Sequence, residues 1–125
     1  MNILVAEDDE PSRELLMDFL TEQGHKVRGV GDGAELVKLA IAERPDLIVT
    51  DLQMPNMNGN SMIAMIDAYP GLEGVPVVII SGAADFEIAD MGLPPEIKVL
   101  HKPYDFELIK ATLSATAEDI ARRKK

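Results

Sequence analysis

Hydrophobic residues in this chain gather in five short runs, separated by longer segments in which apolar and polar positions alternate with a helical period. The runs are rich in Val, Ile and Leu and have the length of β-strands. The fourth run, "VPVVIIS", is the most hydrophobic, and we expect it to be buried on both sides. The five predicted strands occupy residues 3–6, 26–30, 46–51, 75–81 and 96–100.

Each predicted strand is followed by a segment that favours a helix. The first segment begins at Pro11 and ends at Gly24, because proline is favoured at a helix start and glycine just past its end. Asn58 is a candidate cap for the third helix, and the fourth is short because Pro94 and Pro95 follow Gly92. The helices are predicted at 11–24, 32–45, 59–69, 84–92 and 105–123.

Three of these helices have a clear apolar face that predicts which side chains point to the core. In the first helix the face consists of Leu15, Leu16, Phe19 and Leu20. In the second it consists of Leu36, Val37, Ala40 and Ile41, and in the last of Phe106, Ile109, Leu113 and Ile120.

The alternation of strands and helices, with short connections, predicts an α/β fold with a parallel sheet and helices on both faces. Right-handed crossovers then favour a doubly wound sheet, in which binding sites lie at the carboxyl ends of the strands. A chain of 125 residues with 46% hydrophobic content is the size of one domain, so we expect residues 1–125 to form a single domain.

Composition excludes several classes of function. The chain has no Cys, so disulfides, thiolate metal sites and thiol nucleophiles are excluded. No apolar stretch is long enough to span a membrane, and the first residues do not resemble a signal peptide, so we expect a cytoplasmic protein. The formal net charge of −10 argues against direct nucleic-acid binding, despite the basic "ARRKK" near the end.

Four of the predicted strands end in residues capable of chemistry. The first ends in Glu7-Asp8-Asp9, the third in Asp51, the fourth in Ser81 and the fifth in Lys102. Carboxylates brought together raise each other's pKa unless a cation compensates them, and Mg²⁺ is the usual hard cation for oxygen ligands. Lys102 adds a positive charge, and the Ser81 hydroxyl can donate to an oxyanion.

Each of these residues also has a simpler interpretation. Asp51 is suited to cap the turn that follows its strand, and residues 7–10 to form an acidic first turn of a helix. Ser81 is suited to cap the next helix, and Lys102 to be a solvated strand end. Because four separate strand ends carry such groups, a shared site is the favoured hypothesis.

The sequence resembles the receiver domain of two-component response regulators, in its single-domain, chemotaxis-regulator-like form. The segments that carry the resemblance are "LVAEDDEPSRELL", "DLIVTDLQMPNMNG", "VPVVIISG" and "KPYD", which follow in the family's order along nearly the whole chain. The resemblance implies a flavodoxin-like (βα)5 sheet with strand order 2-1-3-4-5. It also implies a phosphorylatable signalling switch rather than an enzyme acting on other substrates.

The resemblance assigns roles residue by residue. Asp51 matches the aspartate that accepts a phosphoryl group from a histidine kinase or histidine phosphotransferase. The Mg²⁺ site would consist of Glu7, Asp8, Asp51 and the backbone carbonyl of Gln53, with Asp8 as a direct ligand and Glu7 acting through water, while Asp9 lies one residue past the acidic pair. Ser81 matches the switch hydroxyl, Lys102 matches the phosphate-binding lysine, and the bond before Pro103 is cis in the family.

The sequence departs from the family at the output side. Receivers often have Tyr or Phe three residues before the lysine, where this chain has Val99, and Tyr104 is no obvious substitute. The segment 84–97 leaves little room for a full fourth helix. We expect an unidentified downstream protein to read the face formed by helix four, strand five and helix five, and we expect a monomer.

Three other classes remain as alternatives. A phosphatase of the haloacid dehalogenase kind needs a second aspartate two residues after the first, where Gln53 stands, and a cap domain. A flavodoxin-like cofactor binder needs a Ser/Thr/Gly-rich loop after the first strand, where acids stand instead. A degenerate receiver would bind partners without phosphorylation, which the full set of acidic, hydroxyl and lysine residues argues against.

Overall fold

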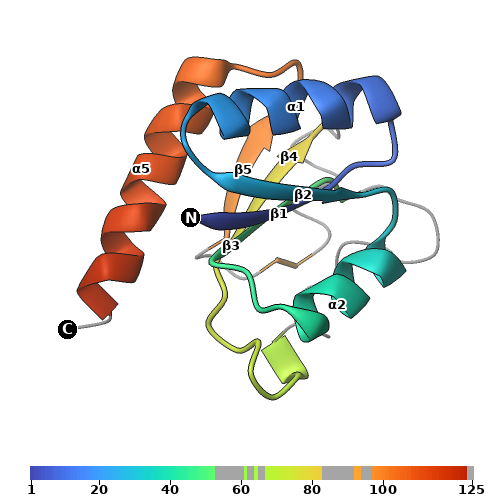
Figure 1. The fold of residues 1–125 in the computed structure, drawn as a ribbon, viewed down its shortest axis with the longest axis vertical. Helices are drawn as coiled ribbons and strands as arrows, with labels where there is room; N and C mark the ends of the chain where they lie inside the picture. The colour runs from blue at the N-terminus through green and yellow to red at the C-terminus, as the bar shows by residue number, and fades with distance from the viewer. Residues whose placement is uncertain (53–60, 62–63, 65–66, 83–91, 94–96, 124–125) are drawn as a thin grey trace.

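Five parallel strands form a single sheet in the computed structural model, which describes residues 1–52, 61, 64, 67–82, 92–93 and 97–123. The strand order is β2-β1-β3-β4-β5, so the predicted order 2-1-3-4-5 is confirmed (Figure 1). The strands are β1 (Asn2–Ala6), β2 (Lys26–Val30), β3 (Leu47–Thr50), β4 (Val77–Ser81) and β5 (Lys98–His101).

Helices cover both faces of this sheet, as the alternating pattern predicts. Helices α1 (Glu10–Glu22) and α5 (Phe106–Arg123) lie over one face, and α2 (Gly33–Ala42) lies over the other (Figure 1). The helix expected at 84–92 lies outside the described residues except for Gly92. Most of the helix expected at 59–69 does too, although residues 61, 64, 67 and 68 are helical. None of the helices among the described residues is both long and apolar enough to cross a membrane.

Side-chain caps explain where α1 and α2 begin. The Asp9 carboxylate accepts the backbone N–H of Ser12, with 3.1 Å between nitrogen and oxygen, and so caps α1. Asp32 caps α2 in the same way through the N–H of Glu35 at 2.7 Å. Such caps satisfy backbone donors that have no partner inside the helix. Gly24, with a φ of +93°, lies just beyond α1.

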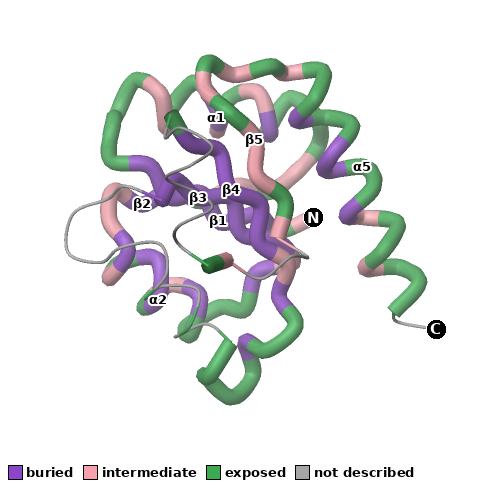
Figure 2. The backbone as a smooth tube through the Cα atoms, turned by 180° about the vertical axis from the view of Figure 1, so that it is seen from behind, coloured by how far each residue is buried: buried purple, intermediate pink, exposed green. Residues whose placement is uncertain are grey.

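The core consists of two apolar layers, one on each face of the sheet. Figure 2 shows buried backbone along the central strands and exposed backbone along the outer surfaces of the helices. Strands β3 and β4 are buried along their whole length, as predicted for "VPVVIIS". Because strand side chains alternate between faces, Ile48 and Ile79 belong to the α2 layer, while Val49 and Ile80 belong to the α1 and α5 layer.

Two side chains predicted to face the core do not. Leu15 is 52% exposed and Ile41 is 41% exposed. A helix lying on a sheet buries a stripe of limited width, and in α1 that stripe is centred on Leu16 and Leu20. Leu15 lies about 100° around the helix from Leu16, which takes it off the stripe. Ile41 has the same relation to the buried Ala40 in α2.

Candidate functional site

The carboxyl ends of β1, β3 and β5 bring together two acids and a lysine. The Nζ of Lys102 lies 2.5 Å from Oε1 of Glu7 and 2.8 Å from Oδ2 of Asp51. Strands β1 and β3 are neighbours with Ala6 paired to Thr50, so Glu7 and Asp51 are the next residues along adjacent strands. Three of the predicted site residues therefore meet at one edge of the sheet.

Backbone hydrogen bonds fix the two acids. The N–H of Asp51 donates to the carbonyl of Ala6 at 3.1 Å, and the N–H of Glu7 donates to the carbonyl of Val30 at 3.1 Å. The N–H of Leu52 donates to Oδ1 of Asp51 at 2.6 Å. Asp51 therefore caps the backbone that follows its strand and also takes part in the shared cluster, since Oδ1 accepts the N–H of Leu52 and Oδ2 faces Lys102.

Ser81 and Lys102 are linked through the main chain. Ser81 ends β4 and is fully buried, and its carbonyl accepts the N–H of Lys102 at 2.9 Å. This bond extends the β4–β5 pairing, in which Ser81 lies opposite His101. The Lys102–Pro103 peptide bond is cis. The interpretation of Lys102 as a solvated strand end is therefore wrong, because its ammonium group binds two carboxylates.

Burial and the contacts among Glu7, Asp51 and Lys102 together determine the electrostatics of the site. Glu7 is 2% exposed, and burial raises the pKa of its carboxyl above the usual 4.5 even though Lys102 opposes the shift. Burial lowers the pKa of Lys102, but its hydrogen bonds and charge interactions with Asp51 and Glu7 outweigh this and raise it. The lysine is therefore a fixed positive charge between two carboxylates.

The three consecutive acids after β1 have different environments. Glu7 is buried, whereas Asp8 and Asp9 are exposed. Asp9 caps α1, and its hydrogen bonds from Ser12 lower the pKa of its carboxyl. The interpretation of residues 7–10 as an acidic helix start thus holds for Asp9 and Glu10 but not for the buried Glu7.

The residues present fit a Mg²⁺ ion. Oε2 of Glu7 is buried and has no hydrogen-bond partner among the described residues. A hydrated cation beside this oxygen would give it one. The described part of the chain contains no cluster of three or more His, Cys, Asp or Glu arranged to hold a metal. Mg²⁺ needs only one or two protein carboxylates, because it keeps several waters. Gln53, the fourth residue of the predicted site, lies outside the described residues.

Two residues near the site were not assigned a role from the sequence. Nη1 of Arg13 donates to the backbone carbonyl of Glu7 at 2.8 Å. The hydroxyl of Tyr104 donates to the carbonyl of Ser12 at 3.2 Å, and burial raises the pKa of Tyr104 to about 12. Tyr104 also lines a small cavity beside Asp51. Tyr104 is part of the segment "KPYD" that carries the family resemblance, whereas no sequence signal singled out Arg13.

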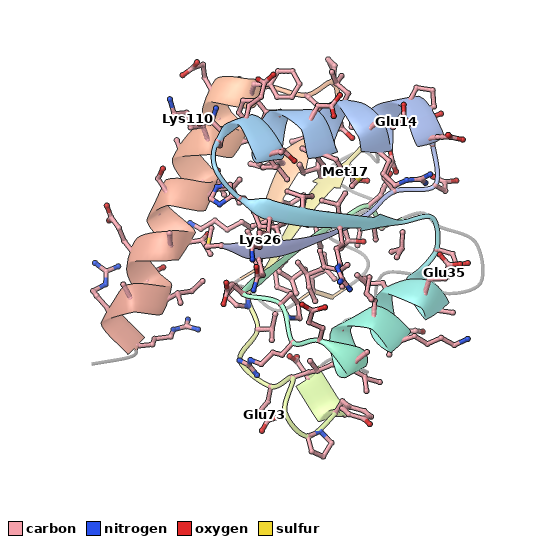
Figure 3. The ribbon with its side chains drawn as sticks, in the orientation of Figure 1. Glu14, Met17, Lys26, Glu35, Glu73 and Lys110 are labelled. Carbon is pink, nitrogen blue, oxygen red and sulfur yellow. The ribbon has the colours of Figure 1, made fainter. Side chains whose placement is uncertain are left out.

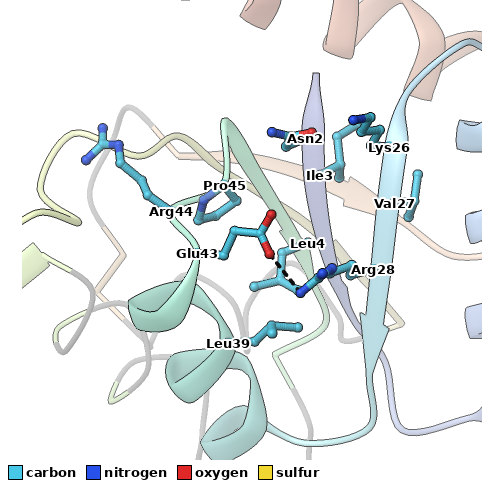
Figure 4. A pocket seen from close by; sticks show the side chains of 10 residues that line it. All are labelled: Asn2, Ile3, Leu4, Lys26, Val27, Arg28, Leu39, Glu43, Arg44 and Pro45. Atoms are coloured by element: carbon cyan, nitrogen blue, oxygen red, sulfur yellow. Dashed lines mark ion pairs between the residues drawn. The ribbon is translucent and has the colours of Figure 1, made fainter.

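A larger cavity, of about 250 Å³, lies at the other end of the sheet, along the amino-terminal halves of β1 and β2 (Figure 4). Arg28 and Glu43 form an ion pair there, with 2.9 Å between nitrogen and oxygen. Both side chains are more than half exposed, so the pair adds little stability. This cavity contains none of the residues that the sequence analysis selected.

Comparison with known proteins identifies the family that the chain resembles. The family profile for the response regulator receiver domain matches residues 3–114. The probable chemotaxis protein CheY of Rhizobium etli is 28% identical over 120 residues, which cover 92% of this chain and 91% of that protein. The 3′,5′-cyclic-nucleotide phosphodiesterase regA of Dictyostelium discoideum is 30% identical over 134 residues. That match covers the whole chain but only 16% of the phosphodiesterase.

Solved structures agree with the sequence relatives. The signal receiver domain of a signal transduction histidine kinase from Syntrophus aciditrophicus superposes with a TM-score of 0.88 and 26% identity, covering 97% of this chain and 92% of that one. Chemotaxis protein CheY4 of Vibrio cholerae superposes with a TM-score of 0.83 at 23% identity and covers 92% of this chain and 97% of that one, which supports the shared fold.

Proposed function

This chain belongs to the response regulator receiver domain family of two-component signalling, and from that premise we propose that Asp51 is its phosphoacceptor. The observation that carries the proposal is the position of Lys102, whose ammonium group bridges Glu7 and Asp51 at the carboxyl edge of the sheet. In a doubly wound sheet this edge is where ligands bind. We propose that residues 1–125 act as one receiver domain in the cytoplasm.

The proposed reaction transfers a phosphoryl group from a phosphohistidine to Asp51. A carboxylate oxygen of Asp51 attacks phosphorus and forms the new P–O bond, while the P–N bond to the donor imidazole breaks and that nitrogen takes up a proton. Oδ1 of Asp51 already accepts the N–H of Leu52, whereas Oδ2 faces Lys102. Catalysis of this kind depends mainly on positioning and on electrostatic stabilisation of the transferred group.

Lys102 supplies a positive charge at the point where negative charge accumulates. Its Nζ lies 2.8 Å from Oδ2 of Asp51, so a phosphoryl group on Asp51 would lie within reach of the ammonium group. The two neighbouring carboxylates raise the pKa of Lys102, and the lysine stays charged at neutral pH. We propose that Lys102 pairs with the phosphoryl oxygens once Asp51 is phosphorylated.

Asp8, Asp51 and the backbone carbonyl of Gln53 are the proposed direct Mg²⁺ ligands, and Glu7 is proposed to act through a water bound to the ion. Bound Mg²⁺ would neutralise charge on the phosphoryl oxygens. The buried Oε2 of Glu7, which has no hydrogen-bond partner within the described residues, supports Glu7 as part of this set. Asp8 is exposed at the same strand end, where it is open to a cation that keeps its waters.

Ser81 is the proposed switch residue. It is fully buried, and its carbonyl binds the N–H of Lys102, so movement of the Ser81 hydroxyl toward a phosphoryl group would act on the start of the β5–α5 connection. Val99 in β5 is partly buried in the α2 layer and has no ring to rotate. We propose that the signal leaves through β5 and α5 without the family's usual aromatic residue.

Receiver domains take phosphoryl groups from histidine kinases, and we propose a histidine kinase or histidine phosphotransferase as the donor. The downstream partner would be a protein that reads the face formed by helix four, β5 and α5. The only reactions we assign to the chain itself are its own phosphorylation and dephosphorylation. Its net charge of −10 disfavours direct binding to nucleic acid.

Amide NMR spectra test this proposal. Wild-type protein and Asp51→Asn would be compared with Mg²⁺ alone and with Mg²⁺ plus a beryllofluoride phosphate mimic. The proposal predicts that the mimic shifts resonances of Ser81, Lys102 and β5 in the wild type but not in Asp51→Asn. Equal shifts in both proteins, or none in either, would contradict Asp51 as the acceptor. Shifts confined to residues 7, 8 and 51 would contradict the switch role of Ser81.

A further inference from the structure

We propose that Arg13 is a positioning residue for the acidic pair Glu7–Asp8, because its side chain passes close to Gly29 and Gly31 and its Nη1 donates to the Glu7 carbonyl. The inference rests on the proposed function, since it concerns the orientation of two residues of the proposed Mg²⁺ site. It adds a residue from α1 and two glycines of the β2–α2 region to the set that builds the site.

The main chain of Glu7 is held on both sides. Its N–H donates to the carbonyl of Val30 at 3.1 Å, and its C=O accepts Nη1 of Arg13 at 2.8 Å. The second bond has a charged donor, and such bonds are roughly twice as strong as neutral ones. The peptide group between Glu7 and Asp8 contains this carbonyl, so Arg13 fixes the plane from which the Asp8 side chain departs.

Two glycines make room for the arginine. A Cβ on Gly31 would lie 3.3 Å from Nη1 of Arg13, the same nitrogen that binds Glu7. A Cβ on Gly29 would lie 3.2 Å from Cδ of Arg13 and 2.4 Å from Sδ of Met17. Figure 3 shows Met17 between α1 and β2. Arg13 lies on the same side of the strand, because its Cδ and the Sδ of Met17 both lie near the Cβ position of Gly29.

Neither glycine is required by its backbone conformation. Gly24, Gly71, Gly74 and Gly92 have positive φ angles, whereas Gly29 and Gly31 do not. A Cβ at Gly31 is therefore compatible with the backbone, and the atom that it would approach within 4 Å, apart from its chain neighbours, is Nη1 of Arg13. A Cβ at Gly31 would thus crowd the nitrogen of Arg13 that binds Glu7, and Arg13 would have to shift to admit it.

The charge of Arg13 and its hydrogen bond to Glu7 should have opposite effects on Mg²⁺ affinity. A positive charge beside a cation site repels the cation, so removing it would strengthen Mg²⁺ binding if charge were its only contribution. If Arg13 instead holds the acidic pair in place, removing it weakens binding. Groups that orient metal ligands typically contribute about 10- to 100-fold in metal affinity.

The test is Mg²⁺ titration of the unphosphorylated full chain, followed by calorimetry and by the amide resonances of Glu7 and Asp8. Arg13→Met removes the charge and the hydrogen bond, and we expect it to bind Mg²⁺ about 10-fold more weakly. Arg13→Lys keeps the charge and one donor, and should recover part of the loss. Gly31→Ala changes no charge and should weaken binding in the same direction by displacing Nη1.

Arg28→Met is the matched control. Arg28 lies on β2, next to Gly29, but it pairs with Glu43 on the other face of the strand from Arg13, so its removal should leave the Mg²⁺ affinity within about twofold (Figure 4). Urea unfolding of each variant separates a loss of stability from a loss of metal affinity. If Arg13→Met does not fold, Gly31→Ala and Arg13→Lys give the same comparison.

Two results would overturn the inference while leaving the proposed function intact. One is wild-type affinity, or tighter binding, in both Arg13→Met and Gly31→Ala. The other is unchanged Glu7 and Asp8 amide resonances in metal-free Arg13→Met. Wild-type protein that binds no Mg²⁺ would instead overturn the proposed function together with the inference.

Discussion

The Nζ of Lys102 lies 2.8 Å from Oδ2 of Asp51, although these residues directly follow β5 and β3, two strands that do not pair with each other. The lysine reaches past the end of β4, which separates β3 from β5 in the sheet. This contact places the positive charge of Lys102 directly beside the carboxylate of the proposed phosphoacceptor.

Replacing Lys102 with methionine should slow phosphorylation of Asp51 by acetyl phosphate about 100-fold, because a charged donor to the phosphoryl oxygens is lost. The rate is measured from intact mass over time in the presence of Mg²⁺. Lys110→Met is the control, since Lys110 is an exposed residue of α5 with the same charge (Figure 3). An equal rate in Lys102→Met and wild type would contradict the role of Lys102.

The raised pKa of Glu7 predicts how the stability of the metal-free protein depends on pH. Between 4.5 and the raised value, the folded state binds more protons at Glu7 than the unfolded state does. The Glu7 contribution to the free energy of unfolding therefore falls as pH rises through this window. Urea unfolding with a chelator present should show that Glu7→Gln lacks this decline. Parallel pH curves for Glu7→Gln and wild type would contradict the assignment.

Asp8 and Asp9 should differ sharply when each is replaced by alanine. Asp9→Ala removes the cap of α1 and should lower the free energy of unfolding by about 1 kcal/mol, with Mg²⁺ affinity nearly unchanged. Asp8→Ala should abolish measurable Mg²⁺ binding with little change in stability, because the side chain is exposed. Urea unfolding and Mg²⁺ titration of both variants check this. Loss of Mg²⁺ binding in Asp9→Ala, with loss of stability in Asp8→Ala, would contradict both assignments.

Ser81→Ala should separate phosphorylation from its consequence. Asp51 keeps its contacts with Lys102 and Leu52 in this variant, so it should still accept a phosphoryl group. The main-chain bond from Lys102 to Ser81 is also retained, but the hydroxyl proposed to move is lost. Amide shifts of residues 98–101 on phosphorylation should shrink strongly. Full wild-type shifts there would show that the signal bypasses Ser81.

The parallel, doubly wound sheet follows from the sequence because apolar runs alternate with helix signals, whereas the order of its strands was expected from the resemblance to receiver domains. The position of each chemical residue at a strand end then fixes which edge of the sheet it occupies. The ends of β1 and β3 meet because their pairing places Ala6 opposite Thr50, a register that the doubly wound topology makes natural. Glu7, Asp51 and Lys102 were therefore predictable as a group.

Contacts that depend on three-dimensional packing were less predictable. Leu15 and Ile41 belong to the right helices, but the width of the stripe that a sheet buries leaves them exposed. The bond from Arg13 to the Glu7 carbonyl requires a long side chain to cross from α1 to the end of β1. Hydrophobic periodicity does not specify such a contact. The close approach of Arg13 to Gly29 and Gly31 likewise becomes visible only when the positions of the neighbouring atoms are known.

The most direct test of the central claim is the mass of the intact protein after incubation with acetyl phosphate and Mg²⁺, with peptide mapping of the modified residue. The account predicts one added phosphoryl group, located on Asp51, that requires Mg²⁺ and is absent from Asp51→Asn. An unmodified wild-type protein, or a phosphoryl group retained by Asp51→Asn, would contradict the claim that Asp51 is the phosphoacceptor.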